Sequence, residues 1–440
     1  MAKRYLIETF GCQMNFHDSE RMAGLLERAG YEATEHEADA DLIVINTCSV
    51  RERAEEKFYS RLGELRNLEK ATGRDRVVAV TGCVAQQEGA RLLGRTPLVD
   101  VVVGTRAIKR LPLLIDQAAR SGQRQVDVSI YEDVSFPLGV ARRSDRVKAY
   151  VTIIEGCNDS CAFCVVPNTR GHERMRPKAD ILAEVREAAA SGRREVHLLG
   201  QIVNHYRAPD DPVCDFAALL EAVQEVEGIE RIRFASPHPR HVSGRLIAAV
   251  RDLPKVCKHL HLPVQSGSTR VLRAMRRRHT REEYLDLVSR IREQVPGVML
   301  STDMIVGFPG ETAEDFDQTL SLVRAVGYQS MFSFKYSERP GTPAATRMPD
   351  LVPEQEKTRR LVELQAVQRA IQTTIHHAMV GQVFEVLVDC WSRRRPSELS
   401  GRTSGNVVVN FPGQPDWFGA VRPIRIQRAG PNSVWGQAVA

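Results

Sequence analysis

Three cysteines lie close together in the segment EGCNDSCAFCVVPNTRG, at Cys157, Cys161 and Cys164. Their CxxxCxxC spacing offers three thiolates on one tight loop, and runs of this kind bind iron–sulfur clusters. Three thiolates bind three irons of a four-iron cluster and leave the fourth iron without a protein ligand. Such an open iron can bind and cleave a small molecule. We therefore expect these three cysteines to be catalytic ligands of an open cluster.

Two other interpretations of this loop remain open. The first is a zinc site that uses His172 as its fourth ligand, and the second is a coincidental group of buried cysteines. Structural zinc sites usually combine two pairs of ligands, and no obvious second pair accompanies this loop. The chain has nine cysteines, and this odd number favours metal ligands over a disulfide framework.

A second set of cysteines, Cys12, Cys48 and Cys83, follows predicted strands in ETFGC, VINTC and AVTGC. The carboxyl ends of parallel strands meet at one edge of a sheet, so these distant residues should converge. We expect a second metal site there, with Gly11 and Gly82 leaving room for a cluster. The alternative is three independent buried thiols. The other cysteines, Cys214, Cys257 and Cys390, show no such context and are expected to be small apolar residues.

The segments around the second set alternate between apolar strands and amphipathic helices. Strands are predicted at YLIETF, DLIVINT, VVAVTG and DVVVG, with helices near residues 18–29, 52–68 and 85–93. This order indicates an open parallel α/β domain, which we assign to residues 3–119. A polar stretch at about 119–145 is predicted to be a linker.

The middle of the chain repeats the strand–helix pattern six times, which is enough for a partial (β/α)6 barrel over residues 143–374. The predicted strands are KAYVTII, EVHLLG, RIRFAS, HLHLPV, MLSTDMIV and MFSFKY. Helices are expected at 179–192 and 280–295, and a long one at about 353–378. The CxxxCxxC loop follows the first strand, so it should lie at the carboxyl end of the barrel, where active sites form.

Several polar or glycine-containing turns follow strands at the same edge and could bind a cofactor. The candidates are Gly200, Gln201, Gln265, Ser266, Gly307 and Glu311. Glycine allows the backbone to approach a ligand closely, although each segment could equally be an ordinary turn. Arg170, Arg174 and Arg176 could neutralise a carboxylate or phosphate, or form a surface basic patch.

Residues 376–440 read as short strands with Gly and Pro turns, which indicates a small all-β barrel. Arg393, Arg394 and Arg395 lie close to Trp391, a pattern that suits RNA binding but also a solvated loop. A net charge of +6 permits a nucleic-acid partner. The sequence contains no signal-peptide core and no apolar run of membrane length, so we expect a cytoplasmic protein without a membrane partner.

The motifs together resemble the methylthiotransferases of the radical S-adenosylmethionine (SAM) superfamily. The resemblance covers nearly the whole chain, and TFGCQMN, NTCSVRERAEEKFYSRLG, TGCVAQQEG and HLPVQSGSTRVLRAMRRRHTREEY match the subgroup that modifies dimethylallyladenosine in tRNA. CVVP followed by TRG is a fairly specific signature. The C-terminal segment is similar to the RNA-binding TRAM module.

This resemblance implies two [4Fe–4S] clusters and SAM as cofactors. Cys157, Cys161 and Cys164 would hold the cluster that binds SAM, with Phe163 at the usual aromatic position, and the second set would hold an auxiliary cluster. Two family motifs differ here, because Leu199-Gly200-Gln201 replaces Gly-Gly-Glu and Asp303 occupies a glycine position.

The implied reaction adds a methylthio group to carbon 2 of N(6)-dimethylallyladenosine at tRNA position 37. The implied partners are the tRNA anticodon stem-loop, an electron donor of flavodoxin or ferredoxin type, and a sulfur or Fe–S supply protein, with the enzyme acting as a monomer. Other substrates in the same class are threonylcarbamoyladenosine in tRNA and an aspartate of a ribosomal protein. The TRG segment and SPHPRH at 236–241 instead favour the isopentenyl-type adenosine, which is the dimethylallyl substrate. A non-catalytic Fe–S regulator that binds RNA is the alternative from another class.

Overall fold

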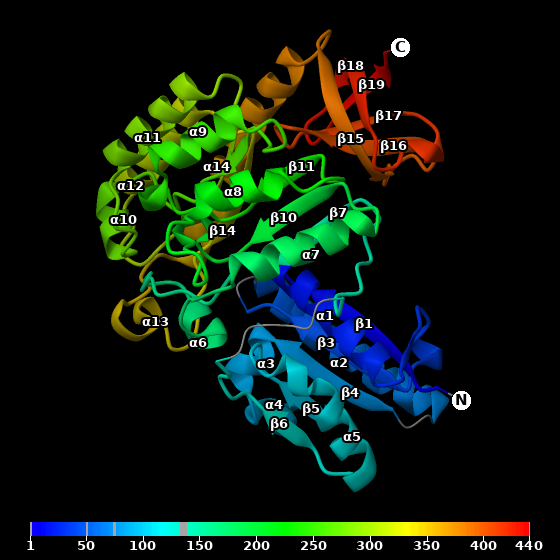
Figure 1. Cartoon of the computed structure of the whole chain (residues 1–440). Helices are drawn as coiled ribbons and strands as arrows, with labels where there is room; N and C mark the ends of the chain where they lie inside the picture. Colours follow the sequence, from blue (N-terminus) through cyan, green and yellow to red (C-terminus); the bar gives the residue numbers. More distant parts are fainter. Residues whose placement is uncertain (1, 50–51, 74–75, 133–138, 440) are drawn as a thin grey trace. The chain divides into compact units, whose positions relative to one another are not determined.

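The computed structural model describes residues 2–49, 52–73, 76–132 and 139–439 (Figure 1). Its contacts form two compact units. The first contains residues 1–144, 154–159 and 164–176, and the second contains 145–153, 160–163 and 177–440. Our domain boundaries at 3–119, 143–374 and 376–440 stay predictions.

The first unit is built on a six-stranded parallel sheet in the order β2-β1-β3-β4-β5-β6. The four predicted strands are present, and the sequence missed two short ones. The strands are β1 (Arg4–Phe10), β2 (Glu32–Ala33), β3 (Leu42–Thr47), β4 (Val77–Gly82), β5 (Val101–Val103) and β6 (Gln125–Asp127).

The predicted linker at 119–145 is wrong over its first part. The helix α5 (Leu111–Ser121) runs into it, and β6 then adds an edge strand to the sheet beside β5. The sequence QVD has only one apolar residue, so neither alternation nor an apolar run marks it as a strand. Residues 133–138 of the predicted linker lie outside the described residues.

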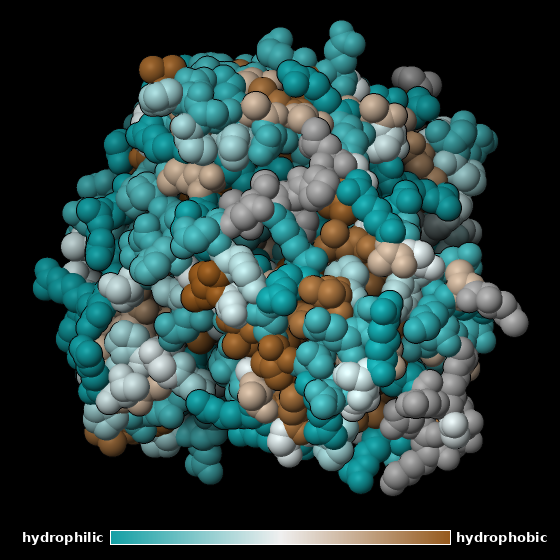
Figure 2. All heavy atoms as spheres, turned by 60° about the horizontal axis from the view of Figure 1, so that its bottom comes forward, coloured by the Kyte–Doolittle hydropathy of each residue, from teal (hydrophilic) through white to brown (hydrophobic). Residues whose placement is uncertain are grey.

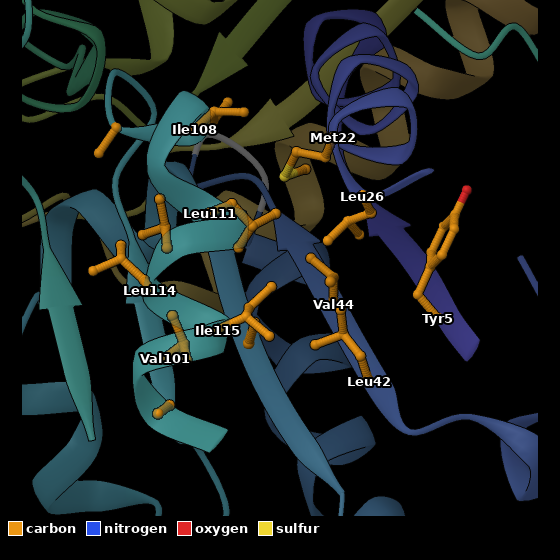
Figure 3. Packing of buried hydrophobic residues seen from close by; sticks show 14 residues of the cluster. Tyr5, Met22, Leu26, Leu42, Val44, Val101, Ile108, Leu111, Leu114 and Ile115 are labelled. Atoms are coloured by element: carbon orange, nitrogen blue, oxygen red, sulfur yellow. The ribbon is translucent and has the colours of Figure 1, made fainter. Parts of the chain in front are cut away.

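Helices cover both faces of this sheet. On one face, Met22 and Leu26 of α1 (Gln13–Arg28) and Ile115 of α5 pack against Leu42 and Val44 of β3 (Figure 3). The other face is covered by α2 (Glu52–Thr72), α3 (Cys83–Glu88) and α4 (Arg91–Arg95). The predicted helix at 85–93 is thus two short helices. The unit also contains α6 (Val166–Arg170), the pair β8 (Ile154–Glu155) and β9 (Arg174–Met175), and 3₁₀ turns η1 (Glu37–Asp39) and η2 (Ile108–Arg110).

The second unit contains the six predicted barrel strands, and the partial barrel is confirmed. They form two parallel three-stranded sheets, β11-β10-β7 and β12-β13-β14, and a backbone bridge joins Ile232 of β11 to Val256 just before β12. The strands are β7 (Lys148–Thr152), β10 (Glu195–Leu199), β11 (Arg231–Phe234), β12 (His259–His261), β13 (Met299–Val306) and β14 (Ser330–Lys335).

Helices follow the strands in chain order and pack outside them. They are α7 (Lys178–Ala190), α8 (Phe216–Gln224), α9 (Gly244–Asp252), α10 (Thr269–Ala274), α11 (Arg281–Gln294), α12 (Ala313–Val326), α13 (Pro343–Arg347) and α14 (Glu354–Ala378), with 3₁₀ turns η3 (Val203–His205) and η4 (Pro239–His241). The predicted long helix is α14. Its Gln365 contacts Ser333 of β14, so Phe332 and Phe334, which alternate with Ser333, point to the barrel interior.

The last part of the second unit is the predicted small all-β barrel, which is closed in the order β15-β16-β17-β19-β18. Its strands are β15 (Val383–Trp391), β16 (Glu398–Thr403), β17 (Val408–Pro412), β18 (Val421–Ala429) and β19 (Val434–Ala438), with the 3₁₀ turn η5 (Pro415–Trp417). Its core includes Val386, Val409 and Phe411.

The small barrel is attached to the first residues of the (β/α)6 strands. Arg233 donates to the carbonyl of Thr403 at 2.7 Å and to Glu195 at 2.8 Å, and Arg231 donates to the carbonyl of Glu385 at 2.8 Å. Lys148 pairs with Asp389 at 2.5 Å. The small barrel therefore lies at the amino ends of these strands, away from the edge where the cysteine loop follows β7.

The face of the molecule in Figure 2 is largely hydrophilic, with apolar residues gathered in a limited strip. None of the helices in the described ranges is long and apolar enough to cross a membrane.

Candidate functional site

The cysteines of the second set do converge in the first unit. Cys12 follows β1, Cys48 follows β3 and Cys83 follows β4, and the thiol of Cys48 lies within hydrogen-bonding reach of both other thiols. The Cys48 amide also donates to the carbonyl of Phe10 at 3.0 Å, which ties the ends of β1 and β3 together. Parallel register alone has placed three thiols at one point.

The surroundings of these thiols favour the thiolate form at two of the three positions. The hydrogen bond from Cys48 and the charge of Arg170 outweigh burial, and they lower the pKa of Cys12 to about 6. The same groups lower the pKa of Cys83 to about 7. The central thiol of Cys48 keeps its proton, because its two hydrogen bonds and burial raise its pKa. Thiolates are the form that binds metal.

A buried amide network explains the glycines beside this site. The side-chain oxygen of Asn15 lies 3.3 Å from the Cys12 thiol, and its nitrogen donates to Asn46 at 3.0 Å. A Cβ at Gly11 would lie 2.5 Å from the Asn15 side chain, and one at Gly82 would lie 2.4 Å from Asn46. Our expectation that these glycines make room for a cluster is therefore replaced, since the asparagines occupy that space.

Arg170 connects the TRG signature to this second cysteine set. It lies at the end of α6, is buried, and pairs with Asp18 of α1 at 2.7 Å. Although burial opposes it, the charges of Asp18, Cys83 and Cys12 hold the pKa of Arg170 well above its usual value. The predicted carboxylate partner of Arg170 is thus a residue of the protein.

Further contacts fix the segment that carries Arg170. Arg106 donates to the carbonyls of Arg170 and His172 at 2.8 and 2.5 Å, and Thr105 donates to the carbonyl of Thr169 at 2.6 Å. The ring nitrogen of His172 lies 3.3 Å from the side-chain oxygen of Asn158, so this contact does not support the zinc interpretation. Arg174 pairs with Glu132, and Arg176 is buried.

The cysteines of the CxxxCxxC loop are divided between the two units. Cys157 and Cys164 belong to the first unit, where the amide of Asp159 donates to the Cys157 sulfur at 3.4 Å. Cys161 belongs to the second unit, where the next residue, Ala162, donates its amide to the carbonyl of Met275 at 2.9 Å. The chain itself keeps Cys161 and Cys164 within about 11 Å of each other.

A residue that the sequence reasoning missed contacts Cys161. One nitrogen of the Arg277 guanidinium lies 3.5 Å from the Cys161 sulfur, and another donates to the carbonyl of Pro263 at 2.8 Å. Arg277 is 7% exposed and has no acidic partner in the described part of the chain. The run RAMRRRHT marks it only as one arginine among several, so the sequence held no signal that would have distinguished it.

The other predicted cofactor residues lie at turns, and several have partners inside the protein. The carboxylate of Glu311 accepts from the Gly307 amide at 2.9 Å and from Arg360 at 2.7 Å. Ser266 is fully buried and accepts from the amide of Ser268 at 3.2 Å. These contacts explain the residues structurally, and their SAM contacts stay predictions.

The remaining candidates are positioned by backbone conformation and packing. Gln265 has a left-handed φ of 78° and bridges the backbone of β13. Gly200 and Gln201 directly follow β10. Phe163 packs against a cluster that includes Met275, Phe308 and Tyr336.

The interior face of the (β/α)6 barrel combines polar and exposed aromatic side chains. His261 of β12 lies 3.3 Å from Asp303 of β13, and its ring meets that of Phe332 edge to face with centroids 6.2 Å apart. Phe332 is 53% exposed and Phe334 is 36% exposed. Because both rings are exposed, this face is not completely covered by other side chains.

The donor sets fit iron–sulfur clusters through their chemistry. Both consist of three cysteines, the usual ligands of such clusters, and N–H groups lie near sulfur at Cys157 and Cys161. Within the described residues, no group of three His, Cys, Asp or Glu is arranged to hold a single metal ion.

Three family models match the chain. They are described as uncharacterized protein family UPF0004 over residues 4–104, radical SAM superfamily over 151–323, and TRAM domain over 377–439. Together these matches follow the order expected from the sequence.

Curated relatives match along the whole chain. The tRNA-2-methylthio-N(6)-dimethylallyladenosine synthase of Alkalilimnicola ehrlichii is 48% identical, with 99% of this chain and 98% of the relative covered. Proteins of the same name from Bordetella petrii and Nitrosospira multiformis are 48% and 47% identical, with 98% and 100% of this chain and 91% and 94% of the relatives covered.

Solved structures support the fold. The radical SAM methyltransferase TsrM from Kitasatospora setae has a TM-score of 0.56 at 15% identity, covering 78% of this chain and 74% of its own. The cobalamin-dependent radical SAM enzyme OxsB has a TM-score of 0.53 at 12% identity, covering 84% and 56%.

Proposed function

The chain belongs to the family of tRNA-2-methylthio-N(6)-dimethylallyladenosine synthases, and from this membership we propose that it adds a methylthio group to carbon 2 of N(6)-dimethylallyladenosine at position 37 of tRNA. It is a radical SAM enzyme with a [4Fe–4S] cluster and SAM as cofactors. The substrate is the adenosine that lies next to the anticodon.

The observation that carries the proposal is the pair of cysteine sets. Cys157, Cys161 and Cys164 alone would identify a generator of radicals. The convergent thiols of Cys12, Cys48 and Cys83 add a second donor set of the kind that a sulfur-inserting enzyme needs. We propose that this second set holds an auxiliary [4Fe–4S] cluster.

The two proposed clusters have different chemical roles. When bound, the first cluster with SAM supplies the radical chemistry that an unactivated ring C–H bond requires. The auxiliary cluster, when bound, supplies the sulfur.

The protein's own residues bind the substrate and shield the reacting atoms. The exposed rings of Phe332 and Phe334 can stack on the purine, since base stacking on aromatic side chains is worth about 1–3 kcal/mol. Asp303, held by His261, can accept a hydrogen bond from the N(6)–H of the base. The adenosine must leave its loop to reach this interior face, and enclosure there excludes water.

The small barrel would bind the rest of the RNA. Trp391 is 43% exposed beside Arg393 and Arg394, so it offers a stacking surface next to positive charge. We also propose a flavodoxin- or ferredoxin-type electron donor, a sulfur or Fe–S supply protein, a monomeric enzyme and a cytoplasmic location.

Nucleoside mass spectrometry of tRNA tests the function. Cells that lack this protein should retain dimethylallyladenosine but lose its methylthio group, and the wild-type gene should restore the group. A gene encoding Cys161→Ala should not restore it, because the open cluster loses a ligand. Loss of the methylthio group from threonylcarbamoyladenosine, or from a ribosomal aspartate, would instead assign one of the other substrates. No change in any of the three would favour an RNA-binding regulator.

A further inference from the structure

The helices α10 and α11 follow one another in the second unit (Figure 1). Residues of these helices and of the loop that joins them line a basic pocket. Its volume is about 500 Å³, and three arginines line it, Arg273, Arg276 and Arg278. The other residues that line the pocket are Ser160, His279, Thr280 and Glu283. Neither cysteine site includes the arginines of this pocket.

The backbone conformation of the loop places consecutive arginines in different surroundings. Arg276 and Arg278 adopt left-handed φ angles of 59° and 56°, which non-glycine residues rarely do, and both are exposed. Arg277 between them is buried and reaches the Cys161 sulfur. Strain of this kind persists where the surrounding structure demands it, often at ligand sites.

The lining of the pocket has an excess of positive charge, because it includes three arginines and one glutamate. Among the described residues, neither Arg273 nor Arg276 forms an ion pair. The acid that lines the pocket, Glu283, accepts the amide of Thr280 at 2.8 Å as part of the N-terminal capping box of α11. The pocket is therefore suited to an anion, and guanidinium groups match phosphate geometry particularly well.

His279 adds a buried ring nitrogen, Nε2, that lacks a hydrogen-bond partner among the described residues. It is 7% exposed, and its Nδ1 lies 3.0 Å from the carbonyl of Arg277, which assigns the ring proton to Nδ1. Burial and the charge of Arg277 lower the pKa of His279 to about 4, so the ring is neutral.

The pocket lies beside the cysteine loop. Ser160 in its wall directly precedes Cys161, and the amide of Ala162 donates to the carbonyl of Met275 at 2.9 Å. Whatever binds in the pocket is therefore held next to the mouth of the barrel. A nucleotide that turns out of its loop into the interior leaves its flanking phosphates at this mouth.

We propose that the pocket formed by Arg273, Arg276 and Arg278 binds backbone phosphates of the tRNA that flank the extruded adenosine. The inference rests on the proposed function and adds a second RNA-binding surface, separate from the small barrel. Guanidinium groups match the geometry of phosphate oxygens, so we favour RNA phosphates over the acidic surface of a reductase, which is the competing occupant.

The test uses a double variant that removes charge and keeps the backbone. Arg276→Asn with Arg278→Asn is suitable because asparagine tolerates left-handed φ angles. Arg245→Gln with Arg251→Gln is the matched control, since it removes two charges of the same unit that pair with Asp215 and Asp252 outside the pocket. Arg273→Gln in α10, at an ordinary helical position, tests the pocket independently of the loop.

Binding of an anticodon stem-loop that contains dimethylallyladenosine is measured against salt concentration. The double variant should bind at least about tenfold more weakly, and its log–log salt slope should fall by about 0.7 for each phosphate that the variant no longer neutralises. Arg273→Gln should show a smaller loss of affinity in the same direction. SAM cleavage with a chemical reductant and no RNA should be unchanged, and the control should match the wild type.

Each other outcome overturns a distinct claim. If the wild type neither binds nor modifies the stem-loop, the proposed function fails. If it does both and the double variant has wild-type affinity and slope, the pocket inference fails alone. If the variant retains RNA affinity but loses activity only with a flavodoxin donor, the pocket binds the reductase and the inference is also wrong.

Discussion

At the scale of single residues, the least expected feature is the buried guanidinium of Arg277 beside Cys161. A buried cation without an acid is costly unless another negative group compensates it. A thiolate that ligates an iron–sulfur cluster would be such a group. Hydrogen bonds to cluster sulfurs raise reduction potentials, so Arg277 is expected to make the cluster easier to reduce.

Replacement of Arg277 by Gln should therefore lower the reduction potential of the cluster held by Cys157, Cys161 and Cys164. We expect a change of about tenfold in the reduction equilibrium, which is about 59 mV for one electron. EPR-monitored titration measures it, with iron content as the check that the cluster assembles. Arg277→Lys keeps the charge and should recover part of the shift. An unchanged potential in the Gln variant with full iron would show that Arg277 only braces the carbonyl of Pro263.

At the scale of elements, the first unit depends on an ion pair that joins α6 to α1. Arg170 and Asp18 are both buried, and loss of one partner leaves an uncompensated charge. Burial raises the pKa of Asp18 while Arg170 opposes this effect. The positive charge of Arg170 thus acts on both Asp18 of α1 and the thiols of the second cysteine set.

The variant Arg170→Gln should lose about 3–5 kcal/mol of stability. Its apparent thermal midpoint should fall by roughly 10 °C in a unit of this size. Asp18→Asn with Arg170→Gln should recover most of the midpoint, because no buried charge is left unpaired. The double variant should still bind less iron at the second cysteine set, since the charge that favours thiolates at Cys12 and Cys83 is gone. Normal iron content at the second cysteine set would show that Arg170 does not contribute to metal binding there.

The small barrel is joined to the (β/α)6 barrel through the strand beginnings. Glu195 is buried, and against the effect of burial Arg233 and His197 hold its pKa well below the usual range. Arg233 also donates to the carbonyls of Thr403 and Ser404. One guanidinium therefore neutralises the charge of Glu195 in β10 and also binds the end of β16. This attachment uses the amino ends of the strands, so the small barrel does not cover their carboxyl ends.

Replacement of Arg233 by Gln should loosen the attachment of the small barrel without disabling the chemistry, since Arg231 and Lys148 still contact it. Limited proteolysis should cut between α14 and β15, near Gly381, faster than in the wild type, and RNA affinity should fall. SAM cleavage without RNA should persist, because the strand beginnings lie away from the cysteine loop. The exposed Arg251→Gln variant should resist proteolysis as the wild type does. If Arg233→Gln is cut no faster than the wild type, the attachment does not depend on this arginine.

At the scale of the whole molecule, the sequence predicted the repeated strand–helix units. It missed the short edge strands and the individual contacts between distant residues. Six barrel strands and the convergence of Cys12, Cys48 and Cys83 followed from apolar runs and parallel topology. The short edge strands β2 and β6 have no such signal. The contacts of Arg170 and Arg277 join residues that are far apart in sequence, so only tertiary structure reveals them.

The two cysteine sets are proposed to have different roles, radical generation and sulfur supply, and this difference gives a prediction for the complete enzyme. Replacement of Cys12, Cys48 and Cys83 by Ala should remove about half of the iron and abolish methylthiolation, yet leave SAM cleavage intact, because the first cluster generates the radical independently. Replacement of Cys157, Cys161 and Cys164 should also remove about half of the iron but abolish both activities. Iron analysis, deoxyadenosine release under anaerobic reduction and nucleoside mass spectrometry measure the three properties on the same preparations. A first variant with full iron content would contradict the two-cluster arrangement, and one that still forms the methylthio group would show that the sulfur comes from elsewhere.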